Sequence, residues 1–216
     1  PNKNNGADTE FAPAERLSQD EVLRQHKDWV DQEQVTLVSN AVPNLMLILN
    51  KQRQIVYSNE HFLKLGDLPN DLSYVGMRVG ELLNCIHAFE TEGGCGTNRF
   101  CKTCGAVLTV LTALSGRDDS EVCNITRRHD LPELNLRVWT SPVMLNGVRY
   151  TIFTMMDIAI ELDNARLLDQ VQNLAVRDPL TGIFNRRAFF ETANREITRS
   201  IRYHNPFSVV MIDLDG

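Results

Sequence analysis

Four of the five cysteines lie within twenty positions of the sequence, so their sulfur atoms could act as one site. Their spacing is C-x9-C-x5-C-x2-C, and glycines flank the second cysteine. Four thiolates can close a tetrahedral zinc site or hold an iron–sulfur cluster. A Cys-x-x-Cys pair near a helix start can instead form a reversible disulfide, and buried cysteines can serve packing alone. These interpretations stay open for the four-cysteine set, which comprises Cys85, Cys95, Cys101 and Cys104.

Two carboxylates at the end of the sequence form a second candidate site. Asp213 and Asp215 follow the apolar run Phe207–Ile212, which predicts a buried strand. Residues two apart on a strand share one face, and open α/β sheets bind ligands at the carboxyl ends of their strands. Carboxylate and phosphate oxygens together suit a hard cation such as Mg²⁺. The alternative is that both carboxylates are simply exposed at a strand end.

The cysteines lie inside a region whose pattern predicts strands and short helices. Asn146-Gly147 is a strong hairpin signal, and Ser18 with Glu21 predicts the capping box of a helix before the sheet. Cys123 lies on an expected strand, outside the spacing of the four-cysteine set, and is assigned to packing. Strands are expected at 45–49, 54–58, 119–128, 133–144 and 148–157, and a longer helix at 102–114.

A helix is also expected after the last strand, over residues 158–176. Its seam steps by 4, 3, 4 and 3 positions, which favours a paired linker helix, although a single amphipathic helix has the same pattern. The apolar faces of this helix and of an N-terminal helix at 17–40 need partners, so we expect a homodimer. The seam consists of Ile160, Asn164, Leu167, Val171 and Leu174.

Composition excludes several classes of protein. The 22 Lys and Arg against 28 Asp and Glu give a net charge of −6, with no basic run to bind nucleic acid. No apolar stretch approaches the ~20 residues of a membrane span, and the first residues lack the apolar core of a secretory signal. We therefore expect a cytoplasmic protein, in which thiols stay reduced and metal or catalytic use of cysteine is favoured over structural disulfides.

The order of the expected elements resembles a PAS domain over residues 41–157. Gln54–Phe62 and Tyr150–Asp157 carry the resemblance. It implies an α+β fold, with a five-stranded antiparallel sheet, helices on one face and flanking helices, that senses an unknown ligand. Flavin-binding light sensors of this family carry Gly-x-Asn-Cys-Arg-Phe, whereas Gly96–Cys101 places its cysteine elsewhere, so a photoreactive site of that kind is not expected.

Two later motifs resemble the start of a GGDEF domain over residues 177–216. They are Arg177–Arg187, which reads RDPLTGIFNRR, and Val209–Gly216. The resemblance implies a parent diguanylate cyclase, which joins two GTP into cyclic di-GMP at a site closed between two subunits. It implies that Mg²⁺ is held by Asp213 and the carbonyl of Leu214. Structural roles at the domain entrance are expected for Asp178, Arg186 and Arg187.

Together these resemblances predict a PAS sensor coupled to a truncated cyclase domain. The 216 residues contain no Gly-Gly-Asp-Glu-Phe stretch, so we expect them to be inactive by themselves. The alternative is a redox- or metal-responsive sensing and dimerisation module without enzymatic output. The expected segments are a disordered lead at 1–16, a helix at 17–40, the sensor at 41–157, the linker at 158–176 and the cyclase start at 177–216.

Overall fold

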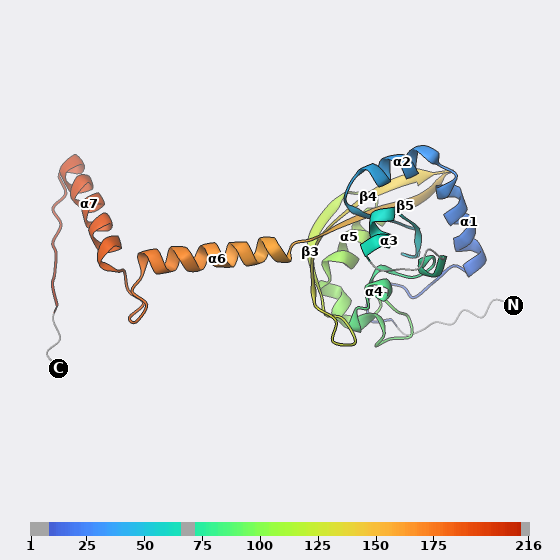
Figure 1. The fold of residues 1–216 in the computed structure, drawn as a ribbon, viewed down its shortest axis with the longest axis horizontal. Helices are drawn as coiled ribbons and strands as arrows, with labels where there is room; N and C mark the ends of the chain where they lie inside the picture. Colours follow the sequence, from blue (N-terminus) through green and yellow to red (C-terminus); the bar gives the residue numbers. More distant parts are fainter. Residues whose placement is uncertain (1–8, 66–71, 213–216) are drawn as a thin grey trace. The chain divides into compact units, whose positions relative to one another are not determined.

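The computed structural model describes residues 9–65 and 72–212 of the chain. The chain divides into two compact units between Ala159 and Ile160. The first unit is built on one antiparallel sheet (Figure 1). Its strand order is β2-β1-β5-β4-β3. Its strands are β1 (Leu45–Leu49), β2 (Ile55–Ser58), β3 (Asp119–Ile125), β4 (Leu134–Leu145) and β5 (Val148–Asp157).

The expected five-stranded antiparallel sheet is confirmed, although the third strand ends at Ile125 rather than at residue 128. The hairpin between β4 and β5 closes with Leu145 paired to Val148. Its two turn residues, Asn146 and Gly147, have φ of 50° and 76°, as a type I′ turn requires. β2 and β3 form the two edges of the sheet, so the segment that connects them crosses one face of the sheet.

That segment consists of short helices. They are α3 (Glu60–Leu65), the 3-10 helix η1 (Leu72–Tyr74), α4 (Val79–Leu82), the 3-10 helices η2 (Ile86–Ala88) and η3 (Arg99–Thr103), and α5 (Gly105–Leu114). α5 packs on the sheet, where the Thr140 hydroxyl donates to the carbonyl of Thr109 at 2.8 Å. The helix expected from residue 102 begins only at Gly105, because Cys104 has extended backbone angles and caps it.

The expected N-terminal helix is two helices, α1 (Gln19–Val30) and α2 (Glu33–Ala41). The predicted capping box is present, since Ser18 and Glu21 bond each other's backbone N–H. The apolar face that was expected to need a partner is covered in part within the unit itself, although Leu37 of α2 is exposed. Val22 and Trp29 are buried in the core of their own unit, and Trp29 meets Tyr150 of β5 edge-to-face at 5.3 Å.

The prediction of a disordered lead is wrong for residues 9–16, and residues 1–8 lie outside the described part of the chain. The backbone N–H of Glu10 donates to Thr97 at 2.9 Å, and that of Ala12 donates to Gly96 at 3.0 Å. The side chain of Ala12 is buried. The lead is ordered because its backbone finds partners that its polar composition does not indicate.

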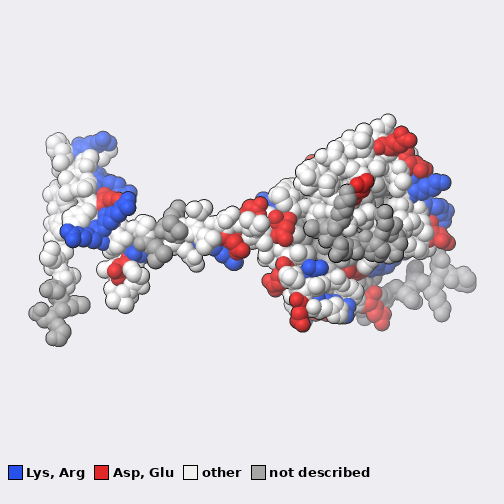
Figure 2. All heavy atoms as spheres, viewed as in Figure 1, with Lys and Arg blue, Asp and Glu red and all other residues white. Residues whose placement is uncertain are grey.

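The second unit contains most of α6 (Ala159–Val176) and α7 (Arg186–Tyr203). Arginines gather on α7 (Figure 2). Of the expected seam of α6, Ile160 and Leu167 are exposed, whereas the side chains of Val171 and Leu174 lie outside the described residues. The expected strand at 207–212 is not formed, since no strand among the described residues pairs with it.

The ordered lead can be tested by placing a charge on it. We expect Ala12→Asp to lower the free energy of unfolding by about 2–3 kcal/mol, because it buries an unpaired carboxylate. Glu15→Ala, which changes an exposed side chain of the same segment, should stay within about 0.5 kcal/mol of the unmodified protein. Urea unfolding followed by circular dichroism measures both, and equal values would show that the lead does not pack.

Candidate functional site

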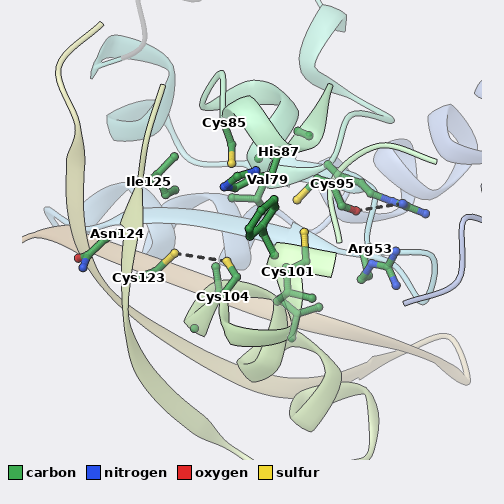
Figure 3. Close-up of a pocket in the computed structure, with 18 of the residues that line it drawn as sticks. Arg53, Val79, Cys85, His87, Cys95, Cys101, Cys104, Cys123, Asn124 and Ile125 are labelled. Atoms are coloured by element: carbon green, nitrogen blue, oxygen red, sulfur yellow. Dashed lines mark hydrogen bonds between the residues drawn. The ribbon is translucent and has the colours of Figure 1, made fainter. Parts of the chain in front are cut away.

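A cavity of about 300 Å³ lies between the sheet and the helical segment (Figure 3). Apolar side chains of β1, β5 and α5 form one part of its wall, among them Leu49, Phe153 and Val110. Sulfur, imidazole and guanidinium groups line other parts of the wall. We call this space the cysteine cavity, because its lining includes Cys85, Cys95, Cys101, Cys104 and Cys123, with Arg53, Arg78 and His87.

Each member of the four-cysteine set reaches the cavity from a different local structure. Cys85 follows α4, Cys101 lies in η3 and Cys104 caps α5. Cys95 lies between Gly94 and Gly96, whose φ of 77° and 91° are open mainly to glycine. The structure therefore brings the predicted set together, and all five cysteines are free thiols.

Gly80 of α4 makes room for two of these thiols. A Cβ atom at this position would lie 2.7 Å from the Cys95 sulfur and 3.4 Å from the Cys85 Cβ. The first distance is shorter than any ordinary contact, so a side chain here would displace Cys95. The absence of a side chain at Gly80 therefore lets Cys85 and Cys95 face the same space.

Cys123 belongs to the site as well, although the sequence analysis assigned it to packing. Its sulfur lies 3.5 Å from that of Cys104, across the gap between β3 and α5. Cys123 is two residues from Ile125, and both side chains are buried on the same face of β3. That alternation was the signal in the sequence that could have placed Cys123 opposite the helix.

The thiols have opposite electrostatic environments. Burial raises the pKa of Cys95 to about 12, and it also raises the pKa values of Cys85 and Cys101. The pKa of Cys104 is lowered, first by the hydrogen bond with Cys123 and then by backbone N–H groups at the start of α5. The same hydrogen bond raises the pKa of Cys123.

Arg78 ties the wall of the cavity together. Its guanidinium is buried and donates to the carbonyls of Gly93 at 2.9 Å and Cys95 at 3.1 Å on one side. On the other side it donates to the carbonyl of Glu15 in the lead at 2.9 Å. Burial, followed by repulsion from Arg53, lowers the pKa of Arg78 to about 9.

Arg53 is the second buried cation of the cavity. It donates to the carbonyl of Pro13 at 2.7 Å, and its Nε has no hydrogen-bond partner among the described residues. A Cβ atom on Gly96 would lie 3.3 Å from the guanidinium, so the glycine lets the loop lie against it. Burial is the main cause that lowers the pKa of Arg53.

His87 lies beside the four-cysteine set (Figure 3). Its Nδ1 is 2.9 Å from the Glu90 carboxylate, and its ring stacks on Phe100 at 4.5 Å between centroids. The carboxylate can only accept, so this contact orients the imidazole ring. The sequence analysis gave no role to His87, Arg53 or Arg78.

The described residues do not fit a single metal ion. Among residues 9–65 and 72–212, no three His, Cys, Asp or Glu side chains form a group that could hold one. A tetrahedral zinc would need four sulfurs at about 2.3 Å from a common point. The residues assigned to magnesium, Asp213 and Leu214, lie outside the described part of the chain.

The residues of the expected domain entrance act locally. The Asp178 carboxylate accepts from the backbone N–H groups of Leu180 and Thr181 at 3.1 and 2.9 Å, and these bonds lower its pKa. Arg187 pairs with Glu191 one turn along α7 at 2.9 Å, and Arg186 lies over the ring of Phe190. Asp178 thus stabilises the turn before α7, and the side chains of the two arginines contact neighbouring side chains of the same helix.

Comparison with known proteins separates the two parts of the chain. The family model "Diguanylate cyclase, GGDEF domain" matches residues 175–216. A search of curated proteins found no match. No helix in the described residues is long and apolar enough to cross a membrane.

Solved PAS structures are similar to the first part. The PAS domain of BvgS from Bordetella pertussis is 15% identical and covers 66% of this chain and 97% of its own, with a TM-score of 0.41. The PAS domain of nitrogen regulation protein NR(II) from Vibrio parahaemolyticus is 17% identical and covers 57% and 96%, with a TM-score of 0.41. A Rhodobacter sphaeroides LOV protein is 13% identical and covers 63% and 68%, with a TM-score of 0.41. The family model thus matches the second part alone, and the first part is an antiparallel sheet with the strand order β2-β1-β5-β4-β3.

The role of Arg78 generates a test of how the cavity wall is held. We expect Arg78→Lys to lower the free energy of unfolding by about 3 kcal/mol, because a point-like ammonium cannot reach carbonyls on both sides. Arg117→Lys, at an exposed turn, serves as the matched control and should change stability by less than about 0.5 kcal/mol. Urea unfolding is the measurement, and a neutral Arg78→Lys would refute the bridging role.

Proposed function

We propose that the chain is the sensing and coupling part of a diguanylate cyclase. In this proposal the PAS unit receives a signal in the cysteine cavity, and the cyclase domain joins two GTP into cyclic di-GMP. The observation that carries the proposal is a cavity with convergent polar and thiol groups, in a chain whose residues 175–216 match the cyclase family model. Because its substrate is GTP, we assign the protein to the cytoplasm.

The connection between cavity and output runs along β5. Phe153 of β5 lines the cavity, and the strand continues to Asp157, whose carboxylate accepts from the N–H of Ala159 at 2.9 Å. Ala159 is the first residue of α6. A change in what fills the cavity therefore acts on the strand that leads directly into the linker helix.

Two exposed apolar surfaces support a homodimer. Leu37 and Val38 of α2 are exposed, and so are Ile160 and Leu167 of α6. Large apolar side chains that gather on one helix face indicate an association surface. In the proposal, pairing through α6 brings two cyclase domains together, as the joining of two GTP molecules requires.

The metal chemistry of the cyclase is assigned by family resemblance. We propose Asp213 and the Leu214 carbonyl as ligands of Mg²⁺, which would supply charge neutralisation for phosphoryl transfer. Asp178 and the arginines of α7 keep structural roles in this proposal, because their side chains bond the local backbone and neighbouring side chains.

The second candidate function is a sensing and dimerisation module without enzymatic output. It is favoured by the cysteine cavity and the exposed apolar side chains of α6, which could serve sensing and association without a cyclase. The two candidates differ in what a longer protein containing these residues does with GTP. Both assign signal reception to the cysteine cavity and a redox or metal response to the four-cysteine set.

Turnover of GTP tests the cyclase assignment. A protein of these 216 residues should form no cyclic di-GMP, whereas a longer protein that contains them should form it. In the longer protein we expect Asp213→Ala to lower kcat by at least about a hundredfold, because the metal loses a carboxylate. Asp118→Ala removes an exposed carboxylate of a turn and should leave kcat unchanged. Full turnover by a folded Asp213→Ala variant would refute the assignment.

Sedimentation tests the dimer. We expect the chain to dimerise, and Leu37→Asp and Leu167→Asp each to raise the dimer Kd by at least about tenfold, since each places a charge on an apolar contact. Arg117→Asp, outside both helices, should leave the Kd unchanged. A monomer at high micromolar concentration, or equal effects of all three substitutions, would contradict the proposed surfaces.

A further inference from the structure

The cysteine cavity has a positive lining that its thiols do not explain. Arg53 and Arg78 both line it, and none of the described lining residues is Asp or Glu. The first turn of α5 lies on the same wall, where Gly105 and Ala106 line the cavity. A helix N-terminus carries partial positive charge. These three sources of positive charge favour an occupant that is negatively charged.

Arg53 adds an observation that points independently to a ligand. The residue is only 7% exposed, and its Nε–H has no acceptor among the described residues. One terminal nitrogen is held by the Pro13 carbonyl at 2.7 Å, which fixes the guanidinium at the cavity wall. A buried cation is costly, so a negatively charged occupant of the cavity beside the guanidinium would offset part of that cost.

The sulfur positions indicate what kind of group that is. In Figure 3 the sulfurs of the four-cysteine set stand around one space and come from different sides of it. Within the described residues they form no group suited to a single ion. In a four-iron cluster each thiolate bonds a different iron, and in a two-iron cluster two thiolates bond each iron. The four ligand sulfurs are therefore further apart than the four ligands of a single metal ion.

We propose that the cysteine cavity binds an anionic iron–sulfur cluster, ligated by the four-cysteine set and balanced in charge by Arg53. The proposal rests on the sensory role proposed for the cavity and names the group that gives it that role. A preformed cluster enters by ligand exchange. Each thiol loses its proton as its sulfur bonds iron, and each departing thiolate takes up a proton, so binding involves no net oxidation.

Cys123 has a different role in this arrangement. Its sulfur lies 3.5 Å from the Cys104 sulfur. When Cys104 bonds iron as a thiolate, the Cys123 thiol is the donor of this pair, and hydrogen bonds to ligating sulfurs tune the potential of a cluster. Cys123 is therefore a positioning residue and not a ligand. Cys123→Ser keeps a donor at this place, which makes it the matched control for the four ligand substitutions.

The first experiment measures iron and acid-labile sulfide in the 216-residue chain, purified anaerobically and reconstituted with iron and sulfide. We expect about two or four irons per chain with equal sulfide, and visible absorption that bleaches in air. Cys85→Ser and Cys101→Ser should each lose most of the iron, whereas Cys123→Ser keeps it. Far-UV circular dichroism confirms that each variant is folded.

The second experiment measures the reduction potential of the loaded protein. Removing a buried cation disfavours the more negative reduced state, so Arg53→Met should have a more negative potential. Arg53→Lys should restore part of the difference. Arg117→Met, which removes an exposed cation, should leave the potential unchanged. A purely structural role of Arg53 would instead lower stability and leave the potential of the remaining cluster unaltered.

Several outcomes overturn the proposal. They are one zinc per chain, metal-free protein in which oxidation joins Cys104 to Cys123, and loss of iron from Cys123→Ser equal to that of the ligand variants. Cyclic di-GMP formation by the longer protein separates this proposal from the proposed function. If the cluster binds but its oxidation leaves GTP turnover unchanged, the proposed function is refuted and the cluster proposal stands. If GTP turnover responds to oxidants in iron-free protein, the cluster proposal is refuted and the proposed function stands.

Discussion

The buried guanidinium of Arg78 joins three segments that are far apart in the sequence. It bonds the carbonyls of the lead, of the turn after β1 and of the loop that carries Cys95. A charged group with 1% exposure is tolerable only when its donors are satisfied, so these carbonyls must stay where they are. The positions of Cys95 and of the cavity wall follow from that requirement.

Much of the first unit could be predicted because its signals are local. The capping box of α1 needs only Ser18 and Glu21, and the β4–β5 hairpin needs only Asn146 and Gly147. Alternation along β4 fixes which side chains face the helices. The strand expected at 207–212 is not formed because its signal is not sufficient locally. A strand needs a hydrogen-bonded partner strand, which the composition of the segment itself does not provide.

The lining of the cavity could be predicted only in part, because some of its residues become neighbours only when the chain folds. Spacing and glycine content brought together the four-cysteine set, because these residues are near one another in the chain. Arg53 lies in a polar turn with a φ of 65°, and composition alone does not show that its side chain is buried. Cys123 lies nineteen residues after Cys104, and only the packing of α5 on β3 makes them neighbours.

The ordered lead changes where the first unit begins. Sheet and helices alone would place the boundary near Ser18, but cleavage there would remove the carbonyls of Pro13 and Glu15 from two buried arginines. Water would then enter to solvate both cations, beside the loop that carries Cys95. The packed unit therefore extends at least to Glu10, whose N–H donates to the carbonyl of Thr97. A protease or recombinant boundary placed by regular secondary structure alone would leave a hydrated cavity.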